Sequence, residues 1–119
     1  MYVLSNENIK QGPNAIETYC ADFSSQLSDG ELLTGTPTVV ESDSGDTLDI
    51  SNEARLGTEF TDTLGNTVAA NKGVVFTVGN AELGVNGEDE SYEITVYCDT
   101  TNTPDRVEMR CRITGTRKA

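Results

Sequence analysis

Three cysteines are the side chains in this sequence best suited to nucleophilic or metal chemistry. They are Cys20, Cys98 and Cys111, an odd number at wide spacings, which fits neither a disulfide framework nor a zinc site. The chain has no histidine and no tryptophan. The usual general base and the common Ser-His and Cys-His nucleophile pairs are therefore absent. We expect reduced thiols, no cofactor and no enzymatic activity.

Carboxylates form the second candidate group. Asp43, Asp46 and Asp49 surround one turn, and the run 88–90 is fully acidic. Oxygen ligands of this kind suit Ca²⁺, but neither cluster has the spacing of a calcium-binding helix-loop-helix. A glycosidase would need two separated carboxylates in a concave site, and a small domain rich in threonine and glycine offers no obvious cleft. Solvated acidic loops without a bound metal are the expectation.

Charge and hydropathy narrow the range of partners. The 119 residues carry 20 acids and 8 bases, a net charge of -12, which repels nucleic-acid phosphates. The apolar runs are far shorter than the roughly 20 residues of a bilayer span, and residues 1–10 lack the pattern of a secretory signal. We expect no nucleic acid and no membrane among the partners, and a protein made and used without crossing a membrane.

The last third of the chain has the clearest strand pattern. Apolar residues occupy every second position in two runs, the period of a half-buried strand, and residues 99–105 between them are turn formers. The alternating residues are Tyr92, Ile94, Val96 and Cys98, then Val107, Met109, Cys111 and Ile113. The pattern predicts an antiparallel hairpin that pairs Cys98 with about Val107. Cys111 then lies too far from Cys98 for a disulfide.

Shorter runs upstream predict further strands. Alternation is visible at 19–23 and 72–78, and short strands are indicated at 31–34, 38–41 and 48–51, whereas 52–71 stays unassigned. With short strands separated by frequent turns, the sequence predicts an all-β fold, a single immunoglobulin-like antiparallel β-sandwich. Its expected core is Tyr19, Ala21, Phe23, Val74, Phe76, Val78, Tyr92, Ile94, Val96, Val107, Met109 and Ile113.

The two ends of the chain are predicted to lie outside the sandwich. Residues 1–17 show no period and predict an extended N-terminal arm, residues 18–114 the β-sandwich domain, and residues 115–119 a basic C-terminal tail. Five of the 8 bases follow position 105, so an acidic body carries a basic last strand and tail. Such polarity suits contact between copies, although a last strand solvated by its arginines remains an equal alternative. The candidate partner-binding residues are Tyr2, Val3, Leu4, Ile9, Arg117 and Lys118.

The order of motifs resembles a family of small virion proteins of tailed bacteriophages, the fibre-tail adaptor or immunoglobulin-like head and tail proteins. In that family, a segment Tyr-x-Val-Asp-Trp-Ser is followed by a leucine and by a Gly-Asp or Gly-Glu turn. This sequence has the similar segment Tyr19-Cys20-Ala21-Asp22-Phe23-Ser24, followed by Leu27 and by Asp29-Gly30-Glu31. Its final hairpin resembles Tyr92-Glu93-Ile94-Thr95, Thr100-Thr101, Arg106 and Arg110-Cys111-Arg112-Ile113. Phenylalanine at position 23 replaces the family tryptophan.

The resemblance implies a multi-copy, non-enzymatic virion component that is assembled in the bacterial host cytoplasm. Its partners would be capsid, tail or fibre subunits and copies of itself, reached through the arm and the tail. The alternative is a free-standing immunoglobulin-like module that binds a carbohydrate or protein through the acidic end loops 41–49 and 79–90.

Overall fold

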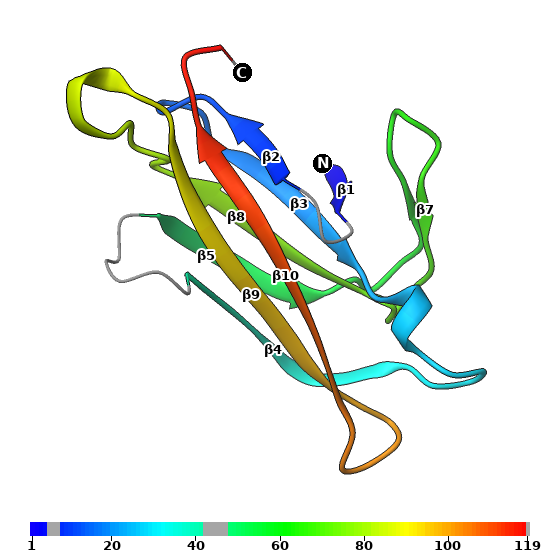
Figure 1. Ribbon diagram of the computed structural model, residues 1–119. Coiled ribbons are helices and arrows are strands. Elements are labelled where there is room, and N and C mark those ends of the chain that lie inside the picture. Colours follow the sequence, from blue (N-terminus) through cyan, green and yellow to red (C-terminus); the bar gives the residue numbers. More distant parts are fainter. Residues whose placement is uncertain (5–7, 42–47, 119) are drawn as a thin grey trace.

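The computed structural model describes residues 1–4, 8–41 and 48–118, and it is built almost entirely from β-strands (Figure 1). In chain order the strands are β1 (Tyr2–Leu4), β2 (Asn8–Gln11), β3 (Glu17–Asp22), β4 (Leu33–Glu41), β5 (Asp49–Arg55), β6 (Phe60–Thr61), β7 (Thr67–Val68), β8 (Gly73–Gly79), β9 (Glu90–Thr100) and β10 (Arg106–Gly115). Two short 3₁₀ turns, η1 (Ser24–Gln26) and η2 (Val85–Gly87), lie in connections. The all-β prediction is confirmed.

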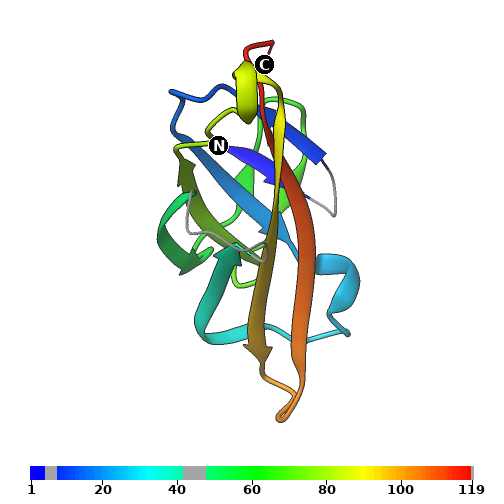
Figure 2. The ribbon, with the colours of Figure 1, turned by 60° about the vertical axis from the view of Figure 1, so that its left-hand side comes forward.

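The strands form two four-stranded sheets with the main hydrophobic core between them. One sheet has the order β1-β3-β8-β5 and the other β2-β10-β9-β4, and both views show the long β9–β10 hairpin running the length of the molecule (Figures 1 and 2). In the hairpin, Cys98 pairs with Val107 as the alternation predicts. All twelve predicted core residues lie in the main core, together with Leu4, Leu33, Val39, Leu48 and Ala81.

The prediction of purely antiparallel sheets is wrong. β1 pairs with β3 in parallel and β2 pairs with β10 in parallel, so both sheets are mixed. The N-terminal segment joins the edge of one sheet and then the edge of the other. Parallel strands cannot be joined by a short turn, so the two strands of a parallel pair are distant in sequence. No local turn motif therefore indicates such a pairing.

The prediction of an extended N-terminal arm over residues 1–17, outside the sandwich, is wrong where the segment forms β1 and β2. β1 and β2 are part of the sheets, Leu4 is fully buried in the main core, and Gln11 is only 2% exposed. The basic tail is also shorter than expected, because Gly115 ends β10 and Thr116 is buried, with its N–H donating to the Gln11 carbonyl over 3.0 Å. Strands of three and four residues are too short to show a period.

The unassigned stretch 52–71 contains the end of β5 and a small hairpin. β6 pairs with β7, and residues from this region form a second cluster of Cys20, Leu56 and Val68 with Val3, Phe60 and Val75. Cys20 alternates with the core residues Tyr19 and Ala21 along β3, so the cluster lies on the opposite face of that sheet. Asp62 anchors the hairpin, since its carboxylate accepts hydrogen bonds from Asn66 and from the Val3 N–H.

All three cysteines are free and buried, at 0%, 1% and 4% exposed for Cys20, Cys98 and Cys111. Burial, with a smaller effect of Asp22, raises the pKa of the Cys20 thiol to about 12, and burial also raises the pKa of Cys98. Since the thiolate is the reactive form, we predict slow reaction with a maleimide at pH 7 in the native protein and rapid threefold labelling in denaturant. Intact mass spectrometry measures both, and rapid native labelling of any thiol would contradict the burial.

Glu31 fastens the connection before β4 to the end of β9. Its side chain is 5% exposed and accepts hydrogen bonds from the Thr100 hydroxyl over 2.6 Å and from the Ser28 N–H over 2.9 Å. These two bonds outweigh the opposing effect of burial and lower the pKa of the Glu31 carboxyl below its ordinary 4.5.

This depressed pKa predicts a loss of stability in acid. A carboxyl whose pKa is lower in the folded than in the unfolded state stabilises the fold above its ordinary pKa, and this contribution disappears as the pH falls through the folded value. The melting temperature of Glu31→Gln should be lower than that of the wild type at pH 7, and the difference should shrink below about pH 4. Glu53→Gln, exposed on β5, is the control and should match the wild type at pH 7. A constant difference across the pH range would contradict the role of Glu31.

Candidate functional site

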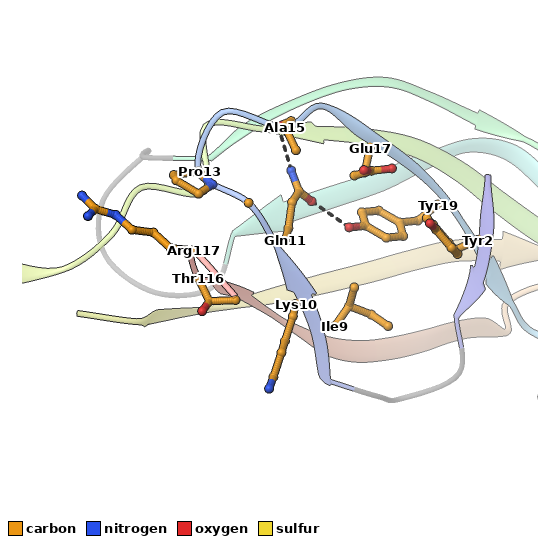
Figure 3. A pocket seen from close by; sticks show the side chains of 11 residues that line it. Tyr2, Ile9, Lys10, Gln11, Pro13, Ala15, Glu17, Tyr19, Thr116 and Arg117 are labelled. Atoms are coloured by element: carbon orange, nitrogen blue, oxygen red, sulfur yellow. Dashed lines mark hydrogen bonds between the residues drawn. The ribbon is translucent and has the colours of Figure 1, made fainter. Parts of the chain in front are cut away.

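A groove of about 490 Å³ runs along the side of the sandwich where the two N-terminal strands lie (Figure 3). It is open to solvent and lies where β1 and β2 form the edges of the two sheets. We call it the terminal groove, because both ends of the chain contribute to it. Its lining residues are Tyr2, Ile9, Lys10, Gln11, Gly12, Pro13, Ala15, Glu17, Tyr19, Thr116 and Arg117.

The floor of the terminal groove is a hydrogen-bonded pair from the two sheets. The Tyr19 hydroxyl donates to Oε1 of Gln11 over 2.7 Å, and Nε2 of Gln11 donates to the carbonyls of Ala15 and Val78 over 3.1 and 2.9 Å. Figure 3 shows the two side chains pointing toward each other from β2 and β3. A buried amide with all these partners fixes the strand that carries it. Gln11 therefore holds β2 against the other sheet.

The Tyr19 phenol is a hydrogen-bond donor at this site rather than an acid. Burial, and next the carboxylate of Glu17, raise the pKa of Tyr19 far above its ordinary value. Because the phenolate is so disfavoured, the hydroxyl stays protonated at any physiological pH. This geometry positions a strand and offers no reactive group.

The walls of the groove are apolar and its rim is basic. Tyr2 is 49% exposed, and Ile9 is partly exposed beside it. Lys10 and Arg117 lie on the rim with one carboxylate, Glu17, opposite (Figure 3). Among the described residues, the ion pairs join Arg106 to Asp99, Arg110 to Glu108 and Arg112 to Glu93, and none of them involves Lys10 or Arg117. The basic strand β10 is thus partly neutralised within its own sheet, whereas the two rim cations have no ion-pair partner among the described residues.

The structure brings three of the six candidate partner-binding residues together. Tyr2, Ile9 and Arg117 line the terminal groove, and Lys118 lies exposed just beyond Arg117. Val3 instead packs, partly buried, against the hairpin cluster, and Leu4 is fully buried in the main core. Sequence reasoning missed Lys10 and the buried Gln11 and placed Tyr19 only in the core.

An acidic loop, residues 80–89, lies at the same end of the molecule as the C-terminus (Figures 1 and 2). Its base is fixed, because the Tyr92 hydroxyl donates to the Glu82 carbonyl over 2.8 Å and Ala81 is fully buried. Gly115 of β10 lies so close to the Ala81 carbonyl that a side chain there would collide with it. The loop is therefore held against the end of β10.

The tip of the acidic loop is a tight turn that exposes an apolar side chain. Gly84 and Glu88 are joined by an N–H to carbonyl bond of 2.8 Å, and Asn86 and Gly87 have positive φ angles of 60° and 74°. Val85 is 79% exposed at this tip. The other loop expected to bind a ligand, 41–49, lies mostly outside the described residues. In the part of the chain that the structure describes, no three His, Cys, Asp or Glu side chains are grouped to hold a metal ion.

Comparison of the chain with known protein families, with curated proteins and with solved structures finds no match. No helix among the described residues has the length and hydrophobicity of a membrane-spanning segment. The features that bear on function are therefore the terminal groove, the strand order and the motifs of the sequence.

Proposed function

We propose that the protein is a non-enzymatic structural subunit of a tailed-phage virion, which docks on head, tail or fibre proteins through the terminal groove. The observation that carries the proposal is the convergence of both chain ends on one groove with apolar walls and a basic rim. Tyr2 and Ile9 supply exposed apolar surface, and Lys10 and Arg117 supply charge without an ion-pair partner among the described residues. Apolar anchors with a charged rim are typical of protein-binding surfaces.

The strand order supports an immunoglobulin-like relationship for this proposed subunit. With β2 left out of the second sheet, the orders β1-β3-β8-β5 and β4-β9-β10 are similar to those of the two sheets of that fold. Tyr92, near the start of β9, donates its hydroxyl to a backbone carbonyl ten residues upstream, in the manner of the tyrosine corner. The parallel pairing of β1 with β3 is a departure from the antiparallel sheets of that fold.

The assignment to a phage particle depends on the resemblance of the motifs. The first matched block begins in β3 and continues through the connection to β4, and the second lies in the β9–β10 hairpin. β3, β9 and β10 are inner strands of the two sheets. In this proposal the protein is made in the bacterial host cytoplasm, incorporated in several copies and retained in the virion. Its partners are capsid, tail or fibre subunits and copies of itself.

Immunogold labelling of purified virions tests the proposal. The wild-type protein should be detected at a fixed position on the particle and co-sediment with it. Tyr2→Asp puts a charge on the apolar wall and should reduce incorporation at least about tenfold, because desolvating an unpaired charge in an interface is unfavourable. Leu64→Asp, at a side chain 80% exposed in the β6–β7 connection, is the matched control and should incorporate normally. Equal incorporation of the two variants would contradict the role of the groove.

The free-standing binding module is the second candidate, and the exposed Val85 at the tip of the acidic loop is the observation that favours it. In that case the protein is absent from purified particles and captures a carbohydrate or protein ligand. Val85→Asp would then abolish ligand capture while Tyr2→Asp leaves it intact.

A further inference from the structure

The acidic loop and the terminal groove of this chain have complementary chemistry. The loop presents Val85, 79% exposed, and the acidic residues Glu88 and Asp89 follow it in the same loop. The groove presents Tyr2 and Ile9 with two cations, Lys10 and Arg117, and one carboxylate, Glu17, in a protein whose net charge is -12. The apolar tip and the acidic residues of the loop are thus complementary to the apolar walls and the basic residues of the terminal groove.

The loop has the rigidity of a ligand that does not need to fold on binding. Its tip is closed by the Gly84–Glu88 bond and by two residues with positive φ, and its base is fixed by Tyr92 and by the close packing of Gly115. A preformed loop loses little conformational entropy when it docks, so even a small contact area contributes to affinity.

The loop cannot enter the groove of its own chain. Its base is held against the end of β10, and Figure 1 shows the tip projecting from the end of the sandwich, away from β1. A Cβ atom added at Gly87 would lie 3.6 Å from a guanidinium nitrogen of Arg117. The Arg117 guanidinium therefore lies against the loop of its own chain, and Lys10 is the rim cation left to face a second loop.

The groove also has room for a backbone segment. Among the described residues, β1 pairs with Tyr19–Ala21, and the first two residues of β3, Glu17 and Thr18, have a strand neighbour on the β8 side alone. On the other wall, β2 is the edge strand of its sheet. Unpaired strand edges accept hydrogen bonds from an incoming chain, so an inserted loop can bind through its backbone as well as through Val85.

We infer that the acidic loop of one copy, with Val85 at its tip, seats in the terminal groove of a second copy of this chain. The contact deepens the proposed function and rests on it, because it supplies the self-association that a multi-copy virion subunit needs. Since the loop and the groove are different surfaces, the contact is heterologous and each copy can both give a loop and receive one. Closed rings or open chains follow, rather than a two-fold dimer.

Sedimentation equilibrium of the full chain tests this contact at about 0.15 M salt, where repulsion between the acidic bodies is screened. The wild type should show concentration-dependent mass above that of the monomer at up to about 1 mM. Val85→Asp removes the loop tip and Lys10→Glu reverses charge on the rim. Both side chains are exposed, so both variants should fold. Each variant alone should weaken self-association at least about tenfold.

Mixing the two variants is the decisive measurement. Val85→Asp keeps an intact groove and Lys10→Glu keeps an intact loop, so an equimolar mixture should form a one-to-one heterodimer that grows no further. Leu64→Asp is the control and should associate like the wild type. A monomeric wild type, or a mixture that stays monomeric while the wild type associates, would overturn the contact. Loss of association in Lys10→Glu but not in Val85→Asp would do the same and would show that the groove receives another segment.

These outcomes are separable from failure of the proposed function. A protein that is monomeric at every concentration but present in purified particles overturns the loop contact alone. A protein that self-associates through loop and groove but is absent from particles overturns the virion assignment alone.

Discussion

Deletion of residues 1–12 should unfold the protein instead of releasing a trimmed, stable domain. The deletion removes β1 and β2, which are edge strands of both sheets, and takes Leu4 and Gln11 out of the buried interior. Loss of a buried leucine side chain alone costs about 2–5 kcal/mol, against a total stability of about 5–15 kcal/mol for a small domain. The lost strand pairing and the hydrogen bonds of Gln11 add to this cost.

Circular dichroism during thermal unfolding measures this effect. Two point variants in β1 provide a matched comparison, because Leu4 is fully buried and Tyr2 is 49% exposed. Leu4→Ala should lower the melting temperature strongly and Tyr2→Ala only slightly. A truncated protein with the same cooperative transition as the full chain would show that residues 1–12 behave as a free arm after all.

Truncation of Phe76 to alanine should cost about 3–5 kcal/mol of unfolding free energy. Phe76 is fully buried on β8, at the centre of its sheet, and its ring packs against Tyr19 with centroids 5.9 Å apart. Surrounding side chains relax only partly around the cavity that the ring would leave, and this adds to the cost.

Urea denaturation gives the free energies for this comparison. Leu64→Ala is the control, since that side chain is 80% exposed and its removal should change stability by less than about 0.5 kcal/mol. Thr95 would be a poor control, because the threonine lies only 8% exposed on β9 despite its outward position in the alternation. Equal effects of Phe76→Ala and Leu64→Ala would mean that the core has been placed wrongly.

The parts of the fold that are visible in the sequence are the ones with local partners and several residues of alternation. β9 and β10 have eleven and ten residues and are joined by a short turn, so both the strands and their register could be predicted. β6 and β7 have two residues each, too few for any period. β1 and β2 find partners along β3 and β10, and for β2 that partner is about a hundred residues away in sequence.

The candidate site was visible only in part for a similar reason. The exposed apolar residues and basic residues of the two ends pointed to Tyr2, Ile9 and Arg117, but not to the groove that unites them. Gln11 could not be identified, because a glutamine becomes a buried anchor only once β3 and β8 place Tyr19 and the Val78 carbonyl around it. Leu4 is predicted to bind a partner but is buried. A single leucine carries no information about which face of a sheet it will join.

The parallel pairing of β2 with β10 also determines how the domain bears mechanical load. In a parallel pair the chain enters β2 at one end and leaves β10 at the other, so opposed forces on the two termini slide the strands along each other. Asn8–Gln11 pair in register with Arg112–Gly115, and the evenly spaced hydrogen bonds of such a ladder then resist together. An antiparallel pair pulled from one end would instead open one bond at a time. A subunit stretched between its two ends would therefore carry tension in shear, across the same β2 strand that forms one wall of the terminal groove.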